Sequence, residues 1–406
     1  MLPQELVDRI LDHLYKSPSA LKACSQVSRA FYPRTRVHLF RCVNCHDPDD
    51  PRLFKMARES PELLQHIKRV EFQCLDYFLP NYEMSTIELM RSLSSSATLS
   101  LWDEGRRNEE GEKGCRWVDM LPTFVSSAPY LAITRLELLC PRLHNFLELH
   151  TVVLSLPNVT ELSIDVLTMS RLDDALTPIH PNMLPVPRIK KMRIHALCFL
   201  SSEFWDGLSS PKYRPVYLDH LEELYVLRPA PSELSLVSNI ISFTSKSLKV
   251  LHIECEQRHW ALPRSSDITT GGHGLPPDTS PLHLNTVTDL RLGVILDKQA
   301  LSFIDWWIKS FKAMSPLILE RLTIGLGGPF LDVLNEPERL KKTFEELSDV
   351  LSKLVRNVDI VFQLHCPFRD VIMEALKEKE NLRVFDLVEN TREVPAFPVF
   401  PLPTGS

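Results

Sequence analysis

The stretch LPQELVDRILDHLYKSPSALKACSQVSRAFYPRTRVHLF, residues 2–40, predicts a compact module of three short helices. Within it Leu6, Ile10 and Leu14 recur every four residues, which gives the first helix an apolar stripe. About forty residues bury too little apolar surface for comfortable independent stability, so we expect this module to have a partner.

Start signals mark the second and third helices. Ser17 followed by Pro18 restarts a helix, because serine caps helices and proline suits the first helical position. Ser28 can cap a third helix, which we expect to settle beyond Pro33, since proline disturbs the turn that contains it. The second helix is expected to bury one apolar face, made of Leu21, Cys24 and Val27.

Four groups of residues in this stretch resemble an F-box in content, spacing and order. They are Leu2-Pro3-x-Glu5-Leu6, Ile10-Leu11-x-x-Leu14, Val27-Ser28-Arg29-x-Phe31 and His38-Leu39-Phe40. In that family the module docks on a Skp-type adaptor, which links it to a cullin-based ubiquitin ligase, and the rest of the chain selects the protein to be ubiquitinated. The alternative is an ordinary amphipathic helical hairpin, since motif matches carry false positives.

The resemblance implies an adaptor-binding module over residues 1–43, followed by a linker over 44–60. We expect the docking face to be apolar, because partner helices usually interlock through apolar stripes. The sequence does not separate residues that face the adaptor from residues that shape the module. Together these are Leu2, Pro3, Leu6, Ile10, Leu11, Leu14, Val27 and Phe31.

Beyond the module, the pattern apolar-x-x-apolar-x-apolar recurs ten times. Of its thirty intervening positions only three are hydrophobic, which is the alternation of a strand with one buried and one solvated face. The copies are Ile67/Val70/Phe72, Ile133/Leu136/Leu138, Val159/Leu162/Ile164, Ile189/Met192/Ile194, Leu221/Leu224/Val226, Leu248/Leu251/Ile253, Val287/Leu290/Leu292, Leu319/Leu322/Ile324, Val355/Val358/Ile360 and Leu382/Phe385/Leu387.

Successive copies after the first begin 26 to 39 residues apart, a spacing that suits a strand plus a return segment. Apolar return segments are expected at 146–156, 234–243, 301–314 and 344–354. The pattern resembles leucine-rich repeats, which often accompany an F-box. The asparagine that follows each strand in that family is present only as Asn390, so we expect an irregular leucine-rich-repeat-like α/β solenoid over 61–394. An unrelated domain of βα units is the alternative.

Two regions depart from the repeat. Residues 73–132 have room for one more unit, with helices over 85–93 and 117–126, a strand over 98–102 and a polar loop over 103–116. Residues 395–406 contain four prolines and no periodicity, and are expected to form a disordered tail.

In such a solenoid the polar strand positions line one concave face. Our hypothesis for the substrate-binding centre is Arg193, Tyr225, His252 and Arg291, because tyrosine and arginine are over-represented at binding hot spots. A simple solvated sheet face is the competing interpretation. The predicted protein is a non-enzymatic substrate receptor of a ubiquitin ligase, and the alternative is an interaction scaffold of the same architecture outside a ligase.

Signals for catalysis or cofactors are weak. Cys42-Val43-Asn44-Cys45-His46 matches a haem-attachment pattern or half a zinc site, but no second C-x-x-C completes the latter. His252 begins a cluster of ligand-type residues without a defined geometry, and Gly325-Leu326-Gly327-Gly328 lacks the third glycine of a dinucleotide loop, where Phe330 stands. A metal or redox enzyme built on Cys42, Cys45 and the His252 cluster is the remaining rival. We expect no cofactor and no metal.

Charge and hydropathy limit the partners and the cellular location that we expect. The formal net charge is −6 with no long basic run, so no nucleic-acid partner is expected. No apolar run approaches the ~20 residues of a membrane span and no signal peptide is visible, so we expect no membrane partner, a cytoplasmic or nuclear location, and reduced cysteines.

Overall fold

The structure is a computed structural model. It describes residues 3–45, 55, 58–74, 93, 96–103, 132–139, 142–143, 152–165, 168–169, 187–195, 217–227, 234–244, 246–255, 281–282, 284–295, 300–314, 319–327, 337–362, 369–376 and 382–386. The chain forms two compact units, Met1–Leu221 and Glu222–Ser406. Both units combine helices with parallel strands, so the chain is an α/β protein, as predicted.

The first unit begins with three helices: α1 (Gln4–His13), α2 (Pro18–Val27) and α3 (Tyr32–Leu39). Pro18 opens α2 as predicted, where its missing N–H has no helical partner to lose. By contrast, α3 starts one residue before Pro33 instead of beyond it, since proline is tolerated in a first turn. Ser28 does not cap α3, because its Oγ accepts from the Ala30 amide (3.2 Å) in the preceding turn.

Six strands of the first unit pair in chain order, and each pair is parallel. Two further short strands pair separately, and a 3-10 helix, η1 (Pro61–His66), precedes β2. The six strands are β1 (Cys42–Cys45), β2 (Arg69–Cys74), β3 (Ala97–Asp103), β4 (Ile133–Leu139), β6 (Glu161–Asp165) and β8 (Lys191–His195), and the short pair is β5 (Arg142–Leu143) with β7 (Thr168–Met169).

Two features of this sheet bear on the sequence predictions. β3 confirms the extra strand expected over 98–102. β1 was not predicted, and the linker expected over 44–60 begins inside it. A four-residue strand such as Cys42–Cys45 is too short for a recognisable alternation, so only its pairing with β2 reveals it.

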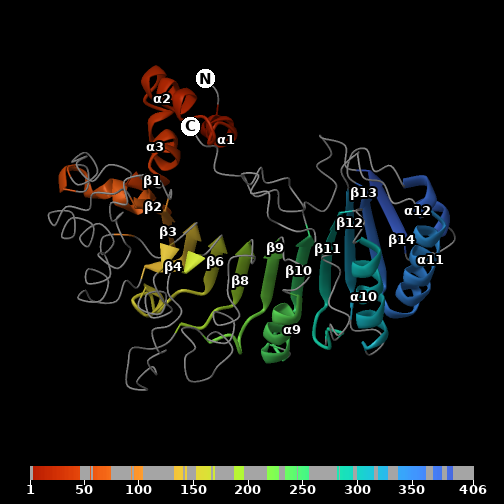
Figure 1. The fold of residues 1–406 in the computed structure, drawn as a ribbon. Helices are drawn as coiled ribbons and strands as arrows, with labels where there is room; N and C mark the ends of the chain where they lie inside the picture. Colours follow the sequence, from red (N-terminus) through yellow and green to blue (C-terminus); the bar gives the residue numbers. More distant parts are fainter. Residues whose placement is uncertain are drawn as a thin grey trace, which may run out of the picture. The chain divides into compact units, whose positions relative to one another are not determined.

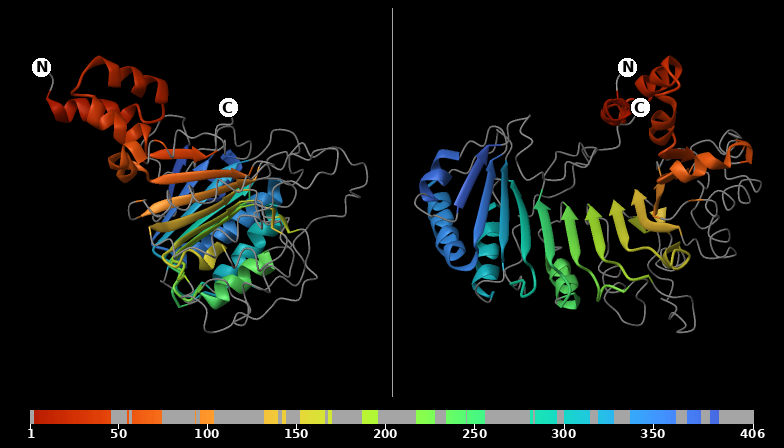
Figure 2. Two further views of the ribbon diagram at one scale, coloured as in Figure 1. Left: turned by 90° about the vertical axis from the view of Figure 1, so that its left-hand side faces the viewer. Right: turned by 180° about the vertical axis from the view of Figure 1, so that it is seen from behind.

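Six parallel strands of the second unit also pair in chain order, and Figures 1 and 2 show its helices on one face of them. The predicted return segments at 234–243, 301–314 and 344–354 are confirmed as α9, α10 and α11. The strands are β9 (Glu223–Leu227), β10 (Val250–Cys255), β11 (Asp289–Ile295), β12 (Arg321–Gly327), β13 (Asn357–Phe362) and β14 (Leu382–Asp386), and the helices are α9 (Leu234–Phe243), α10 (Ala300–Lys312), α11 (Pro337–Leu354) and α12 (Arg369–Ala375).

The register confirms the repeat in nine of its ten copies. The central apolar position of each copy pairs with that of its neighbour: Val70, Leu99 (on β3), Leu136, Leu162 and Met192 in the first unit, and Leu224, Leu251, Leu290, Leu322 and Val358 in the second. All of these side chains are buried. The tenth copy was misplaced, because Val358 and Ile360 pair with Leu382 and Val384. Its middle position is therefore Arg383.

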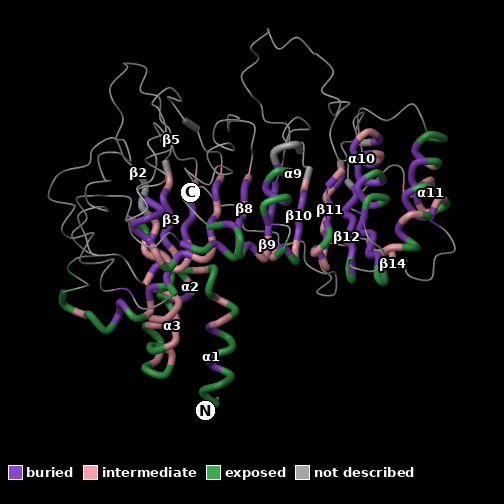
Figure 3. Tube along the Cα trace, turned by 90° about the horizontal axis from the view of Figure 1, so that it is seen from below, coloured by how far each residue is buried: buried purple, intermediate pink, exposed green. Residues whose placement is uncertain are grey.

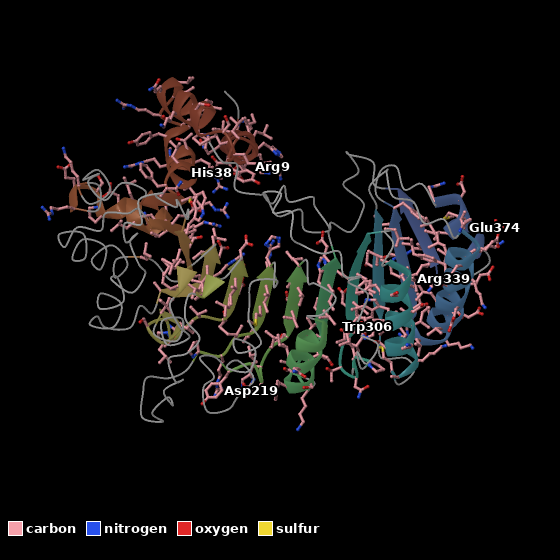
Figure 4. The ribbon with its side chains drawn as sticks, viewed as in Figure 1. Arg9, His38, Asp219, Trp306, Arg339 and Glu374 are labelled. Atoms are coloured by element: carbon pink, nitrogen blue, oxygen red, sulfur yellow. The ribbon has the colours of Figure 1, made fainter. Side chains whose placement is uncertain are left out.

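α10 supplies the aromatic core of the second unit. Trp306, labelled in Figure 4, stacks on Phe303 with ring centroids 6.0 Å apart, and meets Trp307 edge-on at 5.0 Å. Trp307 also contacts Phe311. All four rings are buried, so this helix is fixed by packing on several sides and holds the strands that carry the polar face.

The remaining predictions concern residues outside the described part of the chain. These are the helices over 85–93 and 117–126, most of the polar loop over 103–116 and the tail over 395–406.

Candidate interaction surfaces

The three N-terminal helices pack around a small apolar core. Val7, Leu11 and Leu21 are buried in it, and Leu14, Cys24, Phe31 and Leu39 pack against it. The inward stripe of α1 therefore begins at Val7, not at Leu6. Figure 3 shows the resulting change between buried and exposed positions along this helix.

Three apolar side chains point away from that core, and we call them the apolar patch. Leu6 is 45% exposed, Ile10 is 52% exposed and Val27 is 74% exposed. Leu6 and Ile10, four positions apart, share one face of α1, and exposed apolar side chains on one face of a small module indicate an interaction site. Pro3, at the start of α1, is exposed as well.

Burial divides the described candidate residues into core positions and surface positions. Leu11 is buried, and Leu14 and Phe31 are half-buried, so these three candidates shape the module. Pro3 and the apolar patch are open to a partner. Leu2 lies outside the described residues.

Val27 corrects the prediction that the second helix buries it. It follows Leu21 by six positions, which is about 240° around a helix at 100° per residue, so the two side chains leave α2 in different directions. Leu21 faces the core, and Val27, the last residue of α2, is left in solvent.

Sequence reasoning missed two exposed aromatic residues on the module. Tyr15 is 48% exposed and lies under the Lys16 ammonium, whose nitrogen is 5.5 Å from the ring centroid. Tyr32 is 47% exposed and lies under the Arg36 guanidinium at 4.8 Å. An aromatic residue next to a basic one in a polar segment was the available signal.

A cluster of charges joins α1 to α3. The Asp12 carboxylate accepts hydrogen bonds from Arg34 at 2.6 and 2.8 Å, and its Oδ1 lies 2.7 Å from Nε2 of the buried His38 ring. Hydrogen bonds from Arg34 and then His38 lower the pKa of Asp12 to about 2, and the same carboxylate raises the pKa of Arg34. The carboxylate therefore fixes the angle between the two helices.

The module continues directly into the first sheet. The Arg41 carbonyl, two residues after α3, accepts from the amides of Lys68 (2.8 Å) and Arg69 (3.0 Å) at the start of β2. Arg36 of α3 lies 3.6 Å from Glu62 of η1. The backbone of the module and that of the sheet are hydrogen-bonded at this junction.

No protein-family model and no curated protein matches the chain. The assignment of function therefore rests on the sequence and on the geometry of these surfaces. Among the described residues, no helix is both long and apolar enough to cross a membrane.

The second candidate surface is the middle row of the strands in the second unit. Tyr225, His252 and Arg291 lie in direct register on β9, β10 and β11, and the rings of Tyr225 and His252 are 5.7 Å apart. The predicted centre is therefore contiguous for these three residues. Arg193 stands on β8, in the middle row of the first unit.

This row is more enclosed than the predicted solvated face. Tyr225 is 8% exposed and His252 is 1% exposed, while Arg291 is partly open. Side chains on neighbouring strands are about 5 Å apart, so bulky residues in one row cover each other. The row continues through buried Thr323 and Asp359.

Acidic neighbours hold the polar groups of this row in place. Asp289, two residues before Arg291 on the same strand, accepts from its guanidinium at 3.3 and 3.0 Å and raises its pKa. The Tyr225 hydroxyl donates to Glu223 at 2.9 Å. Both side chains are thus preorganised, which lowers the entropy lost when a partner binds.

The corresponding row of the first unit is an ionic network. Glu137 on β4, only 8% exposed in its side chain, lies 2.8 Å from Arg69 and 2.9 Å from Arg135, and accepts from the Ser100 hydroxyl at 3.2 Å. Its partners come from three neighbouring strands, so the network ties β2, β3 and β4 together. Its charges are satisfied within the sheet, which favours a structural role.

The structure places both cysteines of the C-x-x-C-H motif on one strand. Cys42 and Cys45 lie on β1, three positions apart, at the edge of the sheet. Partial burial of the Cys42 thiol, with the nearby Glu71 carboxylate, raises its pKa to about 11, although the residue as a whole is exposed at the sheet edge.

The structure also gives the His252 cluster and the glycine-rich segment at Gly325 a different interpretation. His252 lies 3.6 Å from Glu254, and among the described residues no three ligand-type side chains are grouped to hold a metal ion. Gly325 and Gly327 lie within β12 instead of in a loop after it, so they are sheet positions. His46, Glu256 and His259 fall outside the described residues.

Proposed function

We propose that this protein is the substrate-recognition subunit of a cullin-based ubiquitin ligase. In this proposal the N-terminal module is an F-box that docks a Skp-type adaptor. The α/β region that follows is of an irregular leucine-rich-repeat-like type and binds the protein to be ubiquitinated. Catalysis then belongs to the partners.

The observation that carries the proposal is the apolar patch. Its three residues, Leu6, Ile10 and Val27, occupy positions of the F-box resemblance and are exposed, while other apolar positions of the same resemblance form the core. Burying these three side chains against a partner would be favourable by roughly 25 cal/mol per Å² of apolar area removed from water, which supports a docking role.

The junction with the sheet supports the same proposal. A receptor must hold its captured protein in a defined position relative to the ligase, and the hydrogen bonds of the Arg41 carbonyl to Lys68 and Arg69 provide a short, ordered connection. Arg291, the partly exposed residue that Asp289 holds in place, is the proposed contact for the captured protein, and the largely buried Tyr225 and His252 lie beside it in the row.

The decisive experiment is co-purification of the full-length protein with a purified Skp-type adaptor and a cullin. We expect the wild-type protein to bind both, and the Leu6→Asp/Ile10→Asp variant to lose both, because a carboxylate cannot be desolvated in an apolar interface. The matched control is Tyr217→Asp/Phe243→Asp, which places the same charges at two other exposed apolar positions, 46% and 45% accessible, and should bind normally.

Three results would count against the proposal in different ways. Failure of the wild-type protein to bind the adaptor would exclude the F-box assignment. Binding of the adaptor without the cullin would favour an interaction scaffold outside a ligase. Equal loss of binding in the control variant would mean that the apolar patch is not the docking site.

A further inference from the structure

The module has an unusual separation of charge along its sequence. Residues 13–46 contain six Lys and Arg but no Asp or Glu, in a chain whose formal net charge is −6. At the overall frequency of 52 acidic residues in 406, a stretch of this length would contain about four. The six basic residues are Lys16, Lys22, Arg29, Arg34, Arg36 and Arg41.

Among the described residues, two of these six charges form ion pairs, and the Lys16 ammonium lies over the Tyr15 ring. Arg34 is bound by Asp12, and Arg36 lies near Glu62. The other four are exposed, and none of them forms an ion pair within the described part of the chain: Lys16, Lys22, Arg29 and Arg41. Most of the positive charge of α2 and of its flanking turns therefore faces solvent.

Two of these exposed cations flank a member of the apolar patch in the sequence. Lys22 and Arg29 lie on either side of Val27 in sequence, on α2 and in the turn after it. That turn is held against the first turn of α1, because the Ala30 carbonyl accepts from Gln4 Nε2 at 3.1 Å. Arg29 is therefore close to the end of α1 that carries Leu6.

We propose that the surface that docks on the apolar patch is acidic, and that Lys22 and Arg29 accelerate its approach. This inference rests on the proposed function, since it specifies the chemistry of the adaptor surface that meets the module. The apolar contacts supply most of the affinity, and the unpaired cations supply the association rate and the orientation.

A protein partner fits these observations better than a nucleic acid. A phosphate backbone would be matched by cations alone and offers no apolar surface for Leu6, Ile10 and Val27 to bury. Isolated cations in a surface that also exposes aliphatic side chains are typical of a protein–protein interface, with an apolar centre and a charged rim.

The test is the binding kinetics of the full-length protein with a purified Skp-type adaptor at 50, 150 and 500 mM salt. Lys22→Glu/Arg29→Glu should lower the association rate constant by about tenfold at 50 mM salt and flatten its dependence on salt, while the dissociation rate constant changes less than about twofold. Lys246→Glu/Lys342→Glu is the matched control, because both lysines are exposed in the second unit and the change in net charge is the same.

The outcomes are distinguishable. If the wild-type protein binds the adaptor and the charge-reversed variant associates as fast as the control, the electrostatic inference is wrong and the proposed function stands. If the wild-type protein does not bind the adaptor at any salt concentration, the proposed function is wrong and this inference fails with it. If a fluorescent duplex oligonucleotide binds the wild-type protein in competition with the adaptor, and the reversal abolishes that binding, the basic surface serves nucleic acid instead.

Discussion

Asp12 on α1 and Arg34 on α3 form a two-point hydrogen bond at 2.6 and 2.8 Å across the N-terminal module. The pair crosses from the first helix to the third, and His38 joins it from the next turn of α3. It therefore fixes the helix that carries Leu6 and Ile10 with respect to the helix that continues into the sheet.

Replacing Asp12 with Asn should loosen α1 without unfolding the sheets. Because the Asp12 side chain is 40% exposed, solvent screens the pair, and we expect a loss of about 1 kcal/mol or less. Hydrogen exchange of the full-length protein would show faster exchange in residues 4–13, with the strands unchanged. An equal effect from Asp8→Asn, which removes a neighbouring carboxylate outside this pair, would contradict the assignment.

The same pair predicts a pH dependence. The pKa of Asp12 falls from 3.8 to about 2 on folding, so the folded state favours the ionised carboxylate. Its contribution is complete above about pH 4 and is lost as the pH falls toward 2, when the carboxylate is protonated. The protection of α1 amides, taken relative to the intrinsic exchange rate at each pH, should therefore fall between pH 4 and 2 more in the wild-type protein than in Asp12→Asn.

The two sides of α1 should respond oppositely to truncation. Leu11→Ala removes a buried side chain and should destabilise the module by about 2–4 kcal/mol, whereas Ile10→Ala removes an exposed one and should change stability by less than about 0.5 kcal/mol. For adaptor affinity we expect the opposite order. Ile10→Ala should weaken binding by more than its small effect on stability explains, whereas Leu11→Ala should weaken binding only as far as it unfolds the module. Limited proteolysis within residues 3–41 and adaptor affinity measure the two effects, and equal destabilisation by both changes would refute the separation of roles.

Glu137 should be the most sensitive carboxylate of the first sheet. Glu137→Ala leaves Arg69, Arg135 and Ser100 without their shared acceptor, and should cost about 2–3 kcal/mol. Glu161→Ala is the matched control, because this side chain is 41% exposed and lies 3.5 Å from Arg135, so we expect less than about 0.5 kcal/mol. Urea unfolding monitored by exchange of the β2–β4 amides would distinguish the two variants.

The polar row of the second unit should decide substrate capture. Tyr225→Ala/Arg291→Ala removes two preorganised side chains and should lower capture of the bound protein at least tenfold, as measured by affinity purification followed by quantitative mass spectrometry. Adaptor binding should be unchanged. Lys246→Ala/Lys342→Ala is the control for surface truncation, and unchanged capture by the Tyr225 and Arg291 variant would exclude this row as the binding centre.

The strand pattern was predictable because it is local. Nine of ten predicted repeat copies pair in the expected register, since the alternation of apolar and polar residues is dictated by the pleat of one strand. The tenth was misplaced, because Leu382, Phe385 and Leu387 fill all three apolar positions, whereas the observed register puts Lys379 at the first of them. Only pairing with β13 reveals the observed register. β1 could not be predicted for a related reason, because four residues are too few to show an alternation of apolar and polar side chains.

The candidate surfaces were less predictable. Tyr225, His252 and Arg291 were proposed together from their position in the repeat, and pairing places them side by side. Their enclosure was not predictable, because it depends on side chains of neighbouring strands that are 27 to 39 residues away in sequence. The ionic network at Glu137 was missed for the same reason.

By itself, the sequence determined most of the helices and strands and the apolar residues of the N-terminal module, because amphipathic period, proline position and strand alternation are properties of short segments. Only the tertiary structure decided which apolar residues of the module are core and which form a surface. Leu6, Val7, Ile10 and Leu11 are chemically alike and adjacent on one helix. The positions of α2 and α3 bury Val7 and Leu11 and leave Leu6 and Ile10 in solvent, where a partner can reach them.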